Sequence, residues 1–99
     1  MYDKIYYPYP ATNNKNKFFI ITNQGKKVNF GAKGYEDFTI HKDEKRKLRY
    51  IARHKPREQD NWNNPNTKSY WSLRLLWNKP TLEASYSDIK KDLKHKGYL

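Results

Sequence analysis

The feature that most constrains the fold is the nature of the chain's apolar residues. Aromatic side chains make up 16% of the 99 residues, whereas all hydrophobic residues together make up only 35%. A globular domain usually has about 45–50% apolar residues, so the core here must be thin and filled mainly by large rings. Disordered chains are poor in aromatics. We therefore expect one small folded domain, the number that this length allows.

Several protein classes are excluded by what the sequence lacks. It contains no cysteine, which excludes disulfide frameworks, cysteine-based zinc sites and thiol nucleophiles. It has no apolar run of about 18 residues, so no transmembrane helix is predicted. Residues 1–10 lack the apolar run of a signal peptide. We expect an intracellular or particle-packaged domain.

The charge points to a polyanionic partner. The chain has 21 Lys and Arg against 10 Asp and Glu, a formal net charge of +11. Residues 42–57 alone carry eight basic and two acidic residues. Such a field favours DNA, RNA, an acidic protein surface or anionic lipid, although a lysine-rich solvated surface with no special role is the simpler alternative.

The residue pattern predicts an α+β fold, with an extended Tyr/Pro-rich arm over residues 1–16 and a single domain over residues 17–99. Within the domain, residues 17–31 have the pattern of an antiparallel β-hairpin, with a turn at Asn23-Gln24-Gly25. An isolated hairpin is only marginally stable, so this small sheet must pack on helices.

Three helices are expected. The first covers His41–Lys55 and ends before Pro56, which disfavours helical geometry at Lys55. The second begins at Pro65 after the N-cap Asn64 and runs to about Asn78 at the centre of the domain. The third begins after the N-cap Thr81 and ends at Gly97. The predicted core consists of Phe19, Ile21, Val28, Phe30, Leu48, Ile51, Tyr70, Leu73, Trp77, Ile89 and Leu93.

The first predicted helix has a basic stripe beside a narrow apolar stripe. At 100° per residue, Lys42, Arg46, Arg49 and Arg53 fall on one face, next to Glu44, Leu48, Ile51 and Ala52. Arginine binds phosphate bidentately. Because no known DNA-reading motif is present, we expect contacts to the backbone rather than to base edges. The candidate nucleic-acid-binding residues are Lys42, Lys45, Arg46, Arg49, Arg53, Arg57, Lys26 and Lys27.

The arm offers a second kind of contact surface. Its candidate partner-binding residues are Tyr2, Tyr6, Tyr7 and Tyr9. Prolines 8 and 10 hold such a segment extended, and tyrosine supplies a large rigid face at little cost in entropy. The arm is expected to be ordered by docking, either on its own domain or on a partner.

No enzyme is predicted, and neither a cofactor nor a metal. The candidates for acid–base or metal chemistry are His41, His54, His95, Asp37, Asp43, Glu58 and Asp60. Their spacing contains no metal-binding pair of the His-x-x-x-His kind and no nucleophile motif. On one straight helix, His41 and His54 would lie about 20 Å apart, too far to share a metal. Asp37 is expected to bind backbone amides or an arginine.

Four segments resemble a family of small, uncharacterised basic proteins encoded by nucleocytoplasmic large DNA viruses, the giant viruses. They are FGAKGYEDFTIHKD at 30–43, YIARHK at 50–55, WNNP at 62–65 and LLWNKPTL at 75–82. The resemblance covers roughly residues 17–93. It implies a viral source and a virion component, located in the virion, the host cytoplasm or a viral factory, and it brings no catalytic residues.

Taken together, these patterns predict a non-enzymatic, virion-associated protein that binds DNA through phosphate contacts without sequence readout. The alternative is a minor capsid or scaffolding protein that ties virion components together through its arm.

Overall fold

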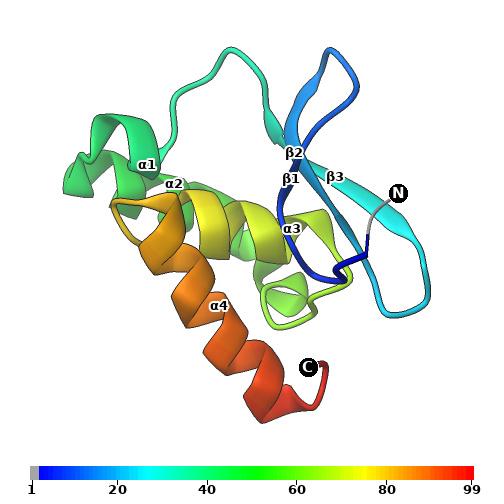
Figure 1. The fold of residues 1–99 in the computed structure, drawn as a ribbon. Coiled ribbons are helices and arrows are strands. Elements are labelled where there is room, and N and C mark those ends of the chain that lie inside the picture. Colours follow the sequence, from blue (N-terminus) through cyan, green and yellow to red (C-terminus); the bar gives the residue numbers. More distant parts are fainter. Residues whose placement is uncertain (1–2) are drawn as a thin grey trace.

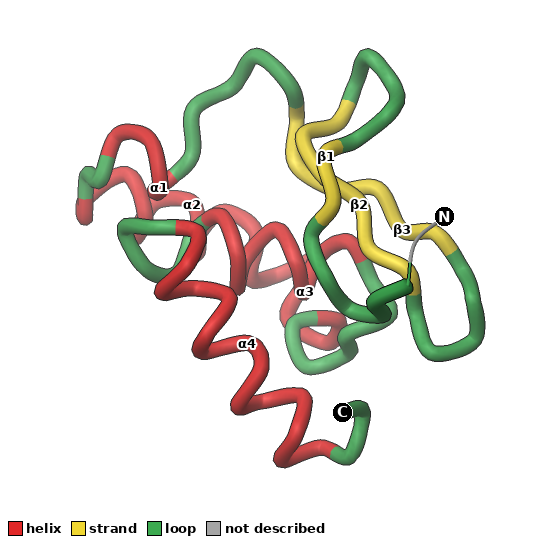
Figure 2. The backbone as a smooth tube through the Cα atoms, in the orientation of Figure 1, coloured by secondary structure: helices red, strands yellow, loops and turns green. Residues whose placement is uncertain are grey.

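A computed structural model describes residues 3–99. These residues form a three-stranded antiparallel sheet beside a group of helices (Figures 1 and 2), which confirms the predicted α+β class. The strands are β1 (Tyr9–Pro10), β2 (Asn16–Ile21) and β3 (Lys27–Ala32), in the spatial order β1-β2-β3. Strand β1, inside the predicted arm, adds an edge to the predicted hairpin.

The register of the hairpin decides which strand residues face the helices. Phe18 lies opposite Phe30, and Ile20 lies opposite Val28. Opposed residues point to the same side of a sheet, so these four face the core, where Ile20 and Phe30 are buried. Phe19 is also buried, but on the other side, where it pairs with Tyr9. The prediction that Ile21 belongs to the core is therefore wrong. Its neighbour Ile20 takes that place, and Ile21 is half-buried.

The helices follow the sheet in the chain. They are α1 (Phe38–His41), α2 (Glu44–Glu58), α3 (Lys68–Trp71) and α4 (Leu82–Lys96). A 3-10 turn, η1 (Gln59–Asn61), extends α2, and a π-helical turn, η2 (Ser72–Leu76), extends α3. The α3–η2 segment packs on β3 and on α4, so it occupies the centre of the domain, as predicted.

The first predicted helix is divided in two. Lys42 adopts a left-handed conformation, with φ 55°, and ends α1. Asp43 then caps α2 by accepting hydrogen bonds from the backbone N–H groups of Lys45 and Arg46. A short polar side chain that caps a new helix competes with helix continuation. The prediction of one helix from His41 is therefore wrong at its start.

Helix α2 also continues past Pro56, contrary to the predicted end. Pro56 is exposed, and the next turn is held by Glu58, which accepts a hydrogen bond from Ser69 of α3 at 2.8 Å. The inward face of α2 differs from the predicted one as well. Tyr50 is its buried residue, whereas Leu48 is 63% exposed and Ile51 is half-buried. Tyr50 stacks on Trp77, and this contact, rather than the aliphatic stripe, determines which face of α2 points inward.

The remaining helix ends follow simple capping rules with one exception. Thr81 caps α4 and Gly97 ends it in a left-handed conformation, both as predicted. The second predicted helix starts later than expected, because Thr67 rather than Asn64 is the N-cap of α3. Asn64 instead forms a turn by accepting the N–H of Asn66 at 3.0 Å.

Rings and long aliphatic side chains fill the core, as the composition predicts. Of the predicted core residues, Leu73 and Trp77 are half-buried, as is Val28. The central cluster of buried residues consists of Tyr6, Ile20, Phe30, Tyr70, Trp71, Leu75, Leu76, Ile89 and Leu93.

The described part of the predicted arm lies on its own domain. Tyr6 has no exposed surface; its hydroxyl donates to Asn66 Oδ1 at 2.5 Å and its ring meets Tyr98 edge-on. Its backbone N–H donates to the carbonyl of Ile21 at 2.8 Å, beside the β1–β2 pairing. Residues 3–16 are thus joined to the sheet and the core.

Candidate functional site

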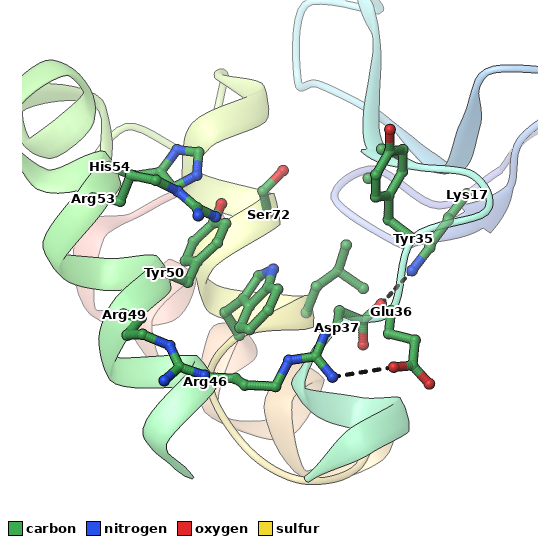
Figure 3. A pocket seen from close by; sticks show the side chains of 14 residues that line it. Lys17, Tyr35, Glu36, Asp37, Arg46, Arg49, Tyr50, Arg53, His54 and Ser72 are labelled. Carbon is green, nitrogen blue, oxygen red and sulfur yellow. Dashed lines mark hydrogen bonds and ion pairs between the residues drawn. The ribbon is translucent and has the colours of Figure 1, made fainter. Parts of the chain in front are cut away.

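A cleft of about 490 Å³ opens between α2 and the loop that leads from β3 to α1 (Figure 3). One wall is the basic side of α2, the other is the loop together with the start of β2, and η2 and Trp77 contribute to the lining. The lining residues are Lys17, Gly31, Ala32, Tyr35, Glu36, Asp37, Arg46, Arg49, Tyr50, Arg53, His54, Ser72, Leu76 and Trp77.

Three of the predicted nucleic-acid-binding residues meet in this cleft. Arg46, Arg49 and Arg53 all line it from α2. The guanidinium of Arg46 reaches across to Glu36 Oε1 at 3.1 Å. Arg49 and Arg53 form no hydrogen bond or ion pair with any side chain in the part of the chain that the structure describes. Two guanidinium groups are thus available to an external anion.

The opposite wall is fixed by a mostly buried ion pair. Lys17 Nζ lies 2.7 Å from Asp37 Oδ2, and both side chains have little exposed surface. Asp37 Oδ1 accepts the backbone N–H of Thr39 at 2.9 Å, so Asp37 also caps α1. Asp37 does bind a backbone amide, as expected, but its cationic partner is a lysine rather than an arginine. This arrangement joins the loop to β2.

A glycine lets the sheet approach η2 beneath the cleft. Gly31 has a φ of +77°, and a Cβ atom there would lie 2.8 Å from Leu76 Cδ1 and 3.3 Å from Lys17 Cβ. A larger residue would require the Leu76 side chain to shift and would strain the backbone at this positive φ. Gly31 therefore allows close packing of β3 against η2 beside the cleft.

Stacked rings join α2 to the segment that follows η2. The rings of Tyr50 and Trp77 lie 4.3 Å apart and 5° from parallel, and His54 stacks on Tyr50 at 4.1 Å. Burial raises the pKa of the Tyr50 hydroxyl, and the nearby carboxylate of Glu58 raises it further. Tyr50 therefore stays protonated and presents a neutral surface beside the arginines.

Glu58 connects the end of α2 to α3. Its carboxylate accepts hydrogen bonds from His54 Nδ1 and from Ser69 Oγ. Partial burial of Glu58 raises its pKa, but the hydrogen bonds from His54 and Ser69, together with the positive charges of His54 and Arg57, hold the pKa below its usual value. Because His54 of α2 and Ser69 of α3 both contact this carboxylate, Glu58 joins the two helices.

The other predicted basic residues lie outside the cleft. Lys42 lines a separate shallow hollow beside Pro80 and donates to the carbonyl of Thr39. Lys45 and Arg57 are exposed on α2 without lining the cleft. Lys27 begins β3, at the opposite end of that strand from Gly31, and lies over the ring of Phe19; Lys26 precedes it in the turn. The hairpin lysines therefore lie outside the cleft that the stripe arginines line.

Of the candidate acid–base residues, His54 and Glu58 contact each other, whereas the three histidines lie apart. His41 belongs to α1 and His54 to α2, so the premise of one shared helix is wrong; the two rings lie on opposite sides of the Tyr50–Trp77 pair. His95 is exposed on α4. Among residues 3–99, no group of three or more His, Asp or Glu side chains is placed to hold a metal ion.

The predicted partner-binding tyrosines have separate positions. Tyr6 is fully buried, so it cannot contact a partner and this prediction is corrected. Tyr7 and Tyr9 are half-buried and lie edge-on to each other at 5.0 Å. Tyr2 lies outside the described residues. Within residues 3–99, no helix is both long and apolar enough to cross a bilayer.

Fold and site together define a small α+β domain with a cleft lined by cations and aromatic rings. Over residues 9–54 the chain is similar to a family of unknown function, DUF5754. The matched segment runs from β1 into α2 and includes every cleft-lining residue except Ser72, Leu76 and Trp77. The searches of curated proteins and of solved structures gave no match.

Several cleft residues were missed from the sequence because they converge only in three dimensions. Lys17, Tyr35 and Trp77 are far apart in the chain, and none belongs to the basic stripe. Of these three residues, only Tyr35 could have been suspected from the sequence. It follows Gly34 in a loop between a strand and a helix, where an aromatic side chain has few neighbours against which to pack.

Proposed function

We propose that this chain is a non-enzymatic, virion-associated basic protein that binds DNA through phosphate contacts without reading base sequence. The observation that carries this proposal is the convergence of Arg46, Arg49 and Arg53 on one cleft, with Arg49 and Arg53 available to an external ligand. A phosphodiester supplies the singly charged oxygens that guanidinium groups bind bidentately.

The spacing of the arginines supports contact with a polymer rather than with one small anion. Arg46 and Arg53 are seven residues apart, which is about 10 Å along the axis of α2. A chain of phosphates can engage several guanidinium groups along that length, each on its own phosphate. On the opposite wall Lys17 is already paired with Asp37. The arginine face of α2 is therefore the surface along which we expect the DNA backbone to lie.

The cellular setting of the proposal rests on the resemblance to proteins of giant viruses. We place the protein in the virion, or in the host cytoplasm or viral factory where particles are built. A net charge of +11 suits a protein that accompanies a polyanionic genome.

The proposal is tested by fluorescence anisotropy with a labelled DNA oligonucleotide, titrated at several salt concentrations between about 50 and 200 mM. Replacing Arg46, Arg49 and Arg53 with Ala should weaken binding at least tenfold at low salt and reduce the slope of log K against log salt by about 2–3. The reason is the loss of phosphate contacts and their released counterions.

The control variant removes the same charge elsewhere. Lys68, Lys91 and Lys94 are exposed on α3 and α4 and do not line the cleft. Changing them to Ala should affect binding much less than the arginine variant. Equal losses in the two triple variants would mean that net charge alone drives binding, and an unaffected arginine variant would exclude the cleft as the site.

The minor capsid or scaffolding role remains the alternative proposal. It relied on an arm free to dock on a partner, and burial of Tyr6 in its own core removes one of the four tyrosines predicted for that contact. A parent protein that fails to bind DNA at low salt, yet occupies ordered positions in a capsid, would favour this alternative.

A further inference from the structure

The cleft has a shape that suits one strand of nucleic acid better than two. Its cations line a concave space of about 490 Å³ between α2 and the β3–α1 loop. This lies within the range of about 300–1,000 Å³ that accommodates small organic ligands. A duplex is a convex rod with its bases paired inside, so it can rest on the rim but cannot place bases in such a space.

An exposed ring stands at the edge of the cleft. Tyr35 is 73% exposed, and its side chain makes no hydrogen bond and no ring contact with the rest of residues 3–99. Figure 3 shows it on the loop wall, across the cleft from Arg53 and Tyr50. Packing gives no reason for a ring here, because the loop is already held by the Lys17–Asp37 pair.

A second ring lies deeper in the cleft. Trp77 has one face covered by Tyr50 and a further contact to His41, yet it stays half-buried and lines the cleft. Aromatic rings that stack bases, beside cations that follow the backbone, are the combination used by proteins that bind single strands without sequence preference. The cleft holds both components on facing walls.

The number of unpaired cations in the cleft limits the length of the strand that it can bind. Four cations and two carboxylates line it, and Glu36 and Asp37 are each paired with a cation of the cleft, Arg46 and Lys17 respectively. Arg49 and Arg53, the two unpaired guanidinium groups, match the charge of two phosphates. A short single-stranded segment of one or two nucleotides satisfies both this charge and the volume.

We infer that the cleft binds single-stranded DNA in preference to duplex, with Arg49 and Arg53 on successive phosphates and an unstacked base against Tyr35. This inference rests on the proposed function and names the form of DNA that the same site takes. Pairing between Arg46 and Glu36 closes one end of the cleft, so the strand lies alongside Arg49 and Arg53 rather than running through it.

The test compares a short oligo(dT) with a duplex of the same length by anisotropy at low salt. The parent should bind oligo(dT) at least tenfold more tightly than the duplex. Tyr35→Ala should weaken oligo(dT) binding at least fivefold, the loss expected for one stacked base, and should weaken duplex binding by a clearly smaller factor. Tyr35→Phe keeps the ring and should bind like the parent.

The outcomes separate the inference from the function on which it rests. If duplex binds as tightly as oligo(dT), or Tyr35→Ala binds oligo(dT) like the parent, the inference is wrong; phosphate binding still stands if the arginine variant loses affinity. If the parent binds neither DNA, both proposals fail. Because Tyr35 is exposed, its variants should melt like the parent, which circular dichroism checks.

Discussion

At the scale of single residues, Trp77 links stability to the candidate site. Its indole stacks on Tyr50 from α2 and also packs against the ring of His41 from α1, at a centroid distance of 5.2 Å. The sequence predicts Trp77 as a core residue, and the structure leaves it half-buried because the uncovered part of the ring lines the cleft. One side chain therefore both fastens α2 and contributes to the binding surface.

Trp77→Ala should lower the free energy of unfolding by about 3 kcal/mol, near the low end of the range for a buried aromatic, since part of the ring is already in water. Urea denaturation measures this loss. Tyr35→Ala removes an exposed ring from the same cleft and should cost less than about 0.5 kcal/mol. A cost below about 1 kcal/mol for Trp77→Ala would show that the stack does not hold α2.

At the scale of elements, α2 is held to the domain by a few discrete contacts. Lys47 Nζ donates to the carbonyl of Asn78 at 2.7 Å near its start, Tyr50 stacks in its middle, and Glu58 accepts from Ser69 at its end. Its opposite face carries the exposed Leu48. These contacts, together with the Arg46–Glu36 ion pair, position the basic wall of the cleft.

Glu58→Gln should destabilise the domain by about 1–2 kcal/mol at neutral pH, because it removes a carboxylate that accepts two hydrogen bonds. The folded-state pKa of Glu58 is lowered from 4.5. Its stabilising effect is therefore complete above that value and is lost as the pH falls through the lower pKa of the folded state. The difference between parent and variant should shrink from pH 7 to pH 3 in thermal melts.

Asp60→Asn is the matched control for this measurement. Asp60 is an exposed carboxylate two residues away, in η1, with no ion pair among the described residues. It should leave stability nearly unchanged at every pH. A Glu58→Gln variant that is destabilised equally at pH 7 and pH 3 would contradict a role for the ionised carboxylate.

At the scale of the whole molecule, the N-terminal segment completes the domain. Strand β1 covers Phe19 on the outer side of the sheet, where Tyr9 and Phe19 stack at 5.5 Å, while Tyr6 enters the central cluster. Tyr86 of α4 also donates to the carbonyl of Tyr6 at 3.1 Å. The first and last parts of the chain thus meet around one side chain.

Deleting residues 1–10 should lower the melting temperature by about 10–20 °C, because it removes a buried aromatic worth about 3 kcal/mol in a domain of this size. Differential scanning calorimetry measures the shift. Tyr6→Phe, which keeps the ring and removes the hydrogen bond to Asn66, should fall between parent and deletion. An unchanged melting temperature after deletion would mean that the segment is not part of the folded core.

The sequence predicts the properties that depend on residues close together in the chain. The hairpin, the Thr81 and Gly97 ends of α4 and the helical grouping of Arg46, Arg49 and Arg53 follow from turn chemistry, capping and helical period, all of which act over a few residues. The aromatic composition also predicted a core made largely of rings. The α+β class follows from these local patterns together.

Only the tertiary structure determines which side chains face one another. Whether α2 turns Tyr50 or Leu48 inward depends on Trp77, about thirty positions along the chain, and the face of Phe19 depends on the register of the hairpin. Tyr6 is buried because Asn66 and Tyr98 surround it. The cleft likewise combines Lys17, Tyr35 and Trp77 with α2. Such contacts between distant segments leave no periodic pattern in a sequence, so no local rule can find them.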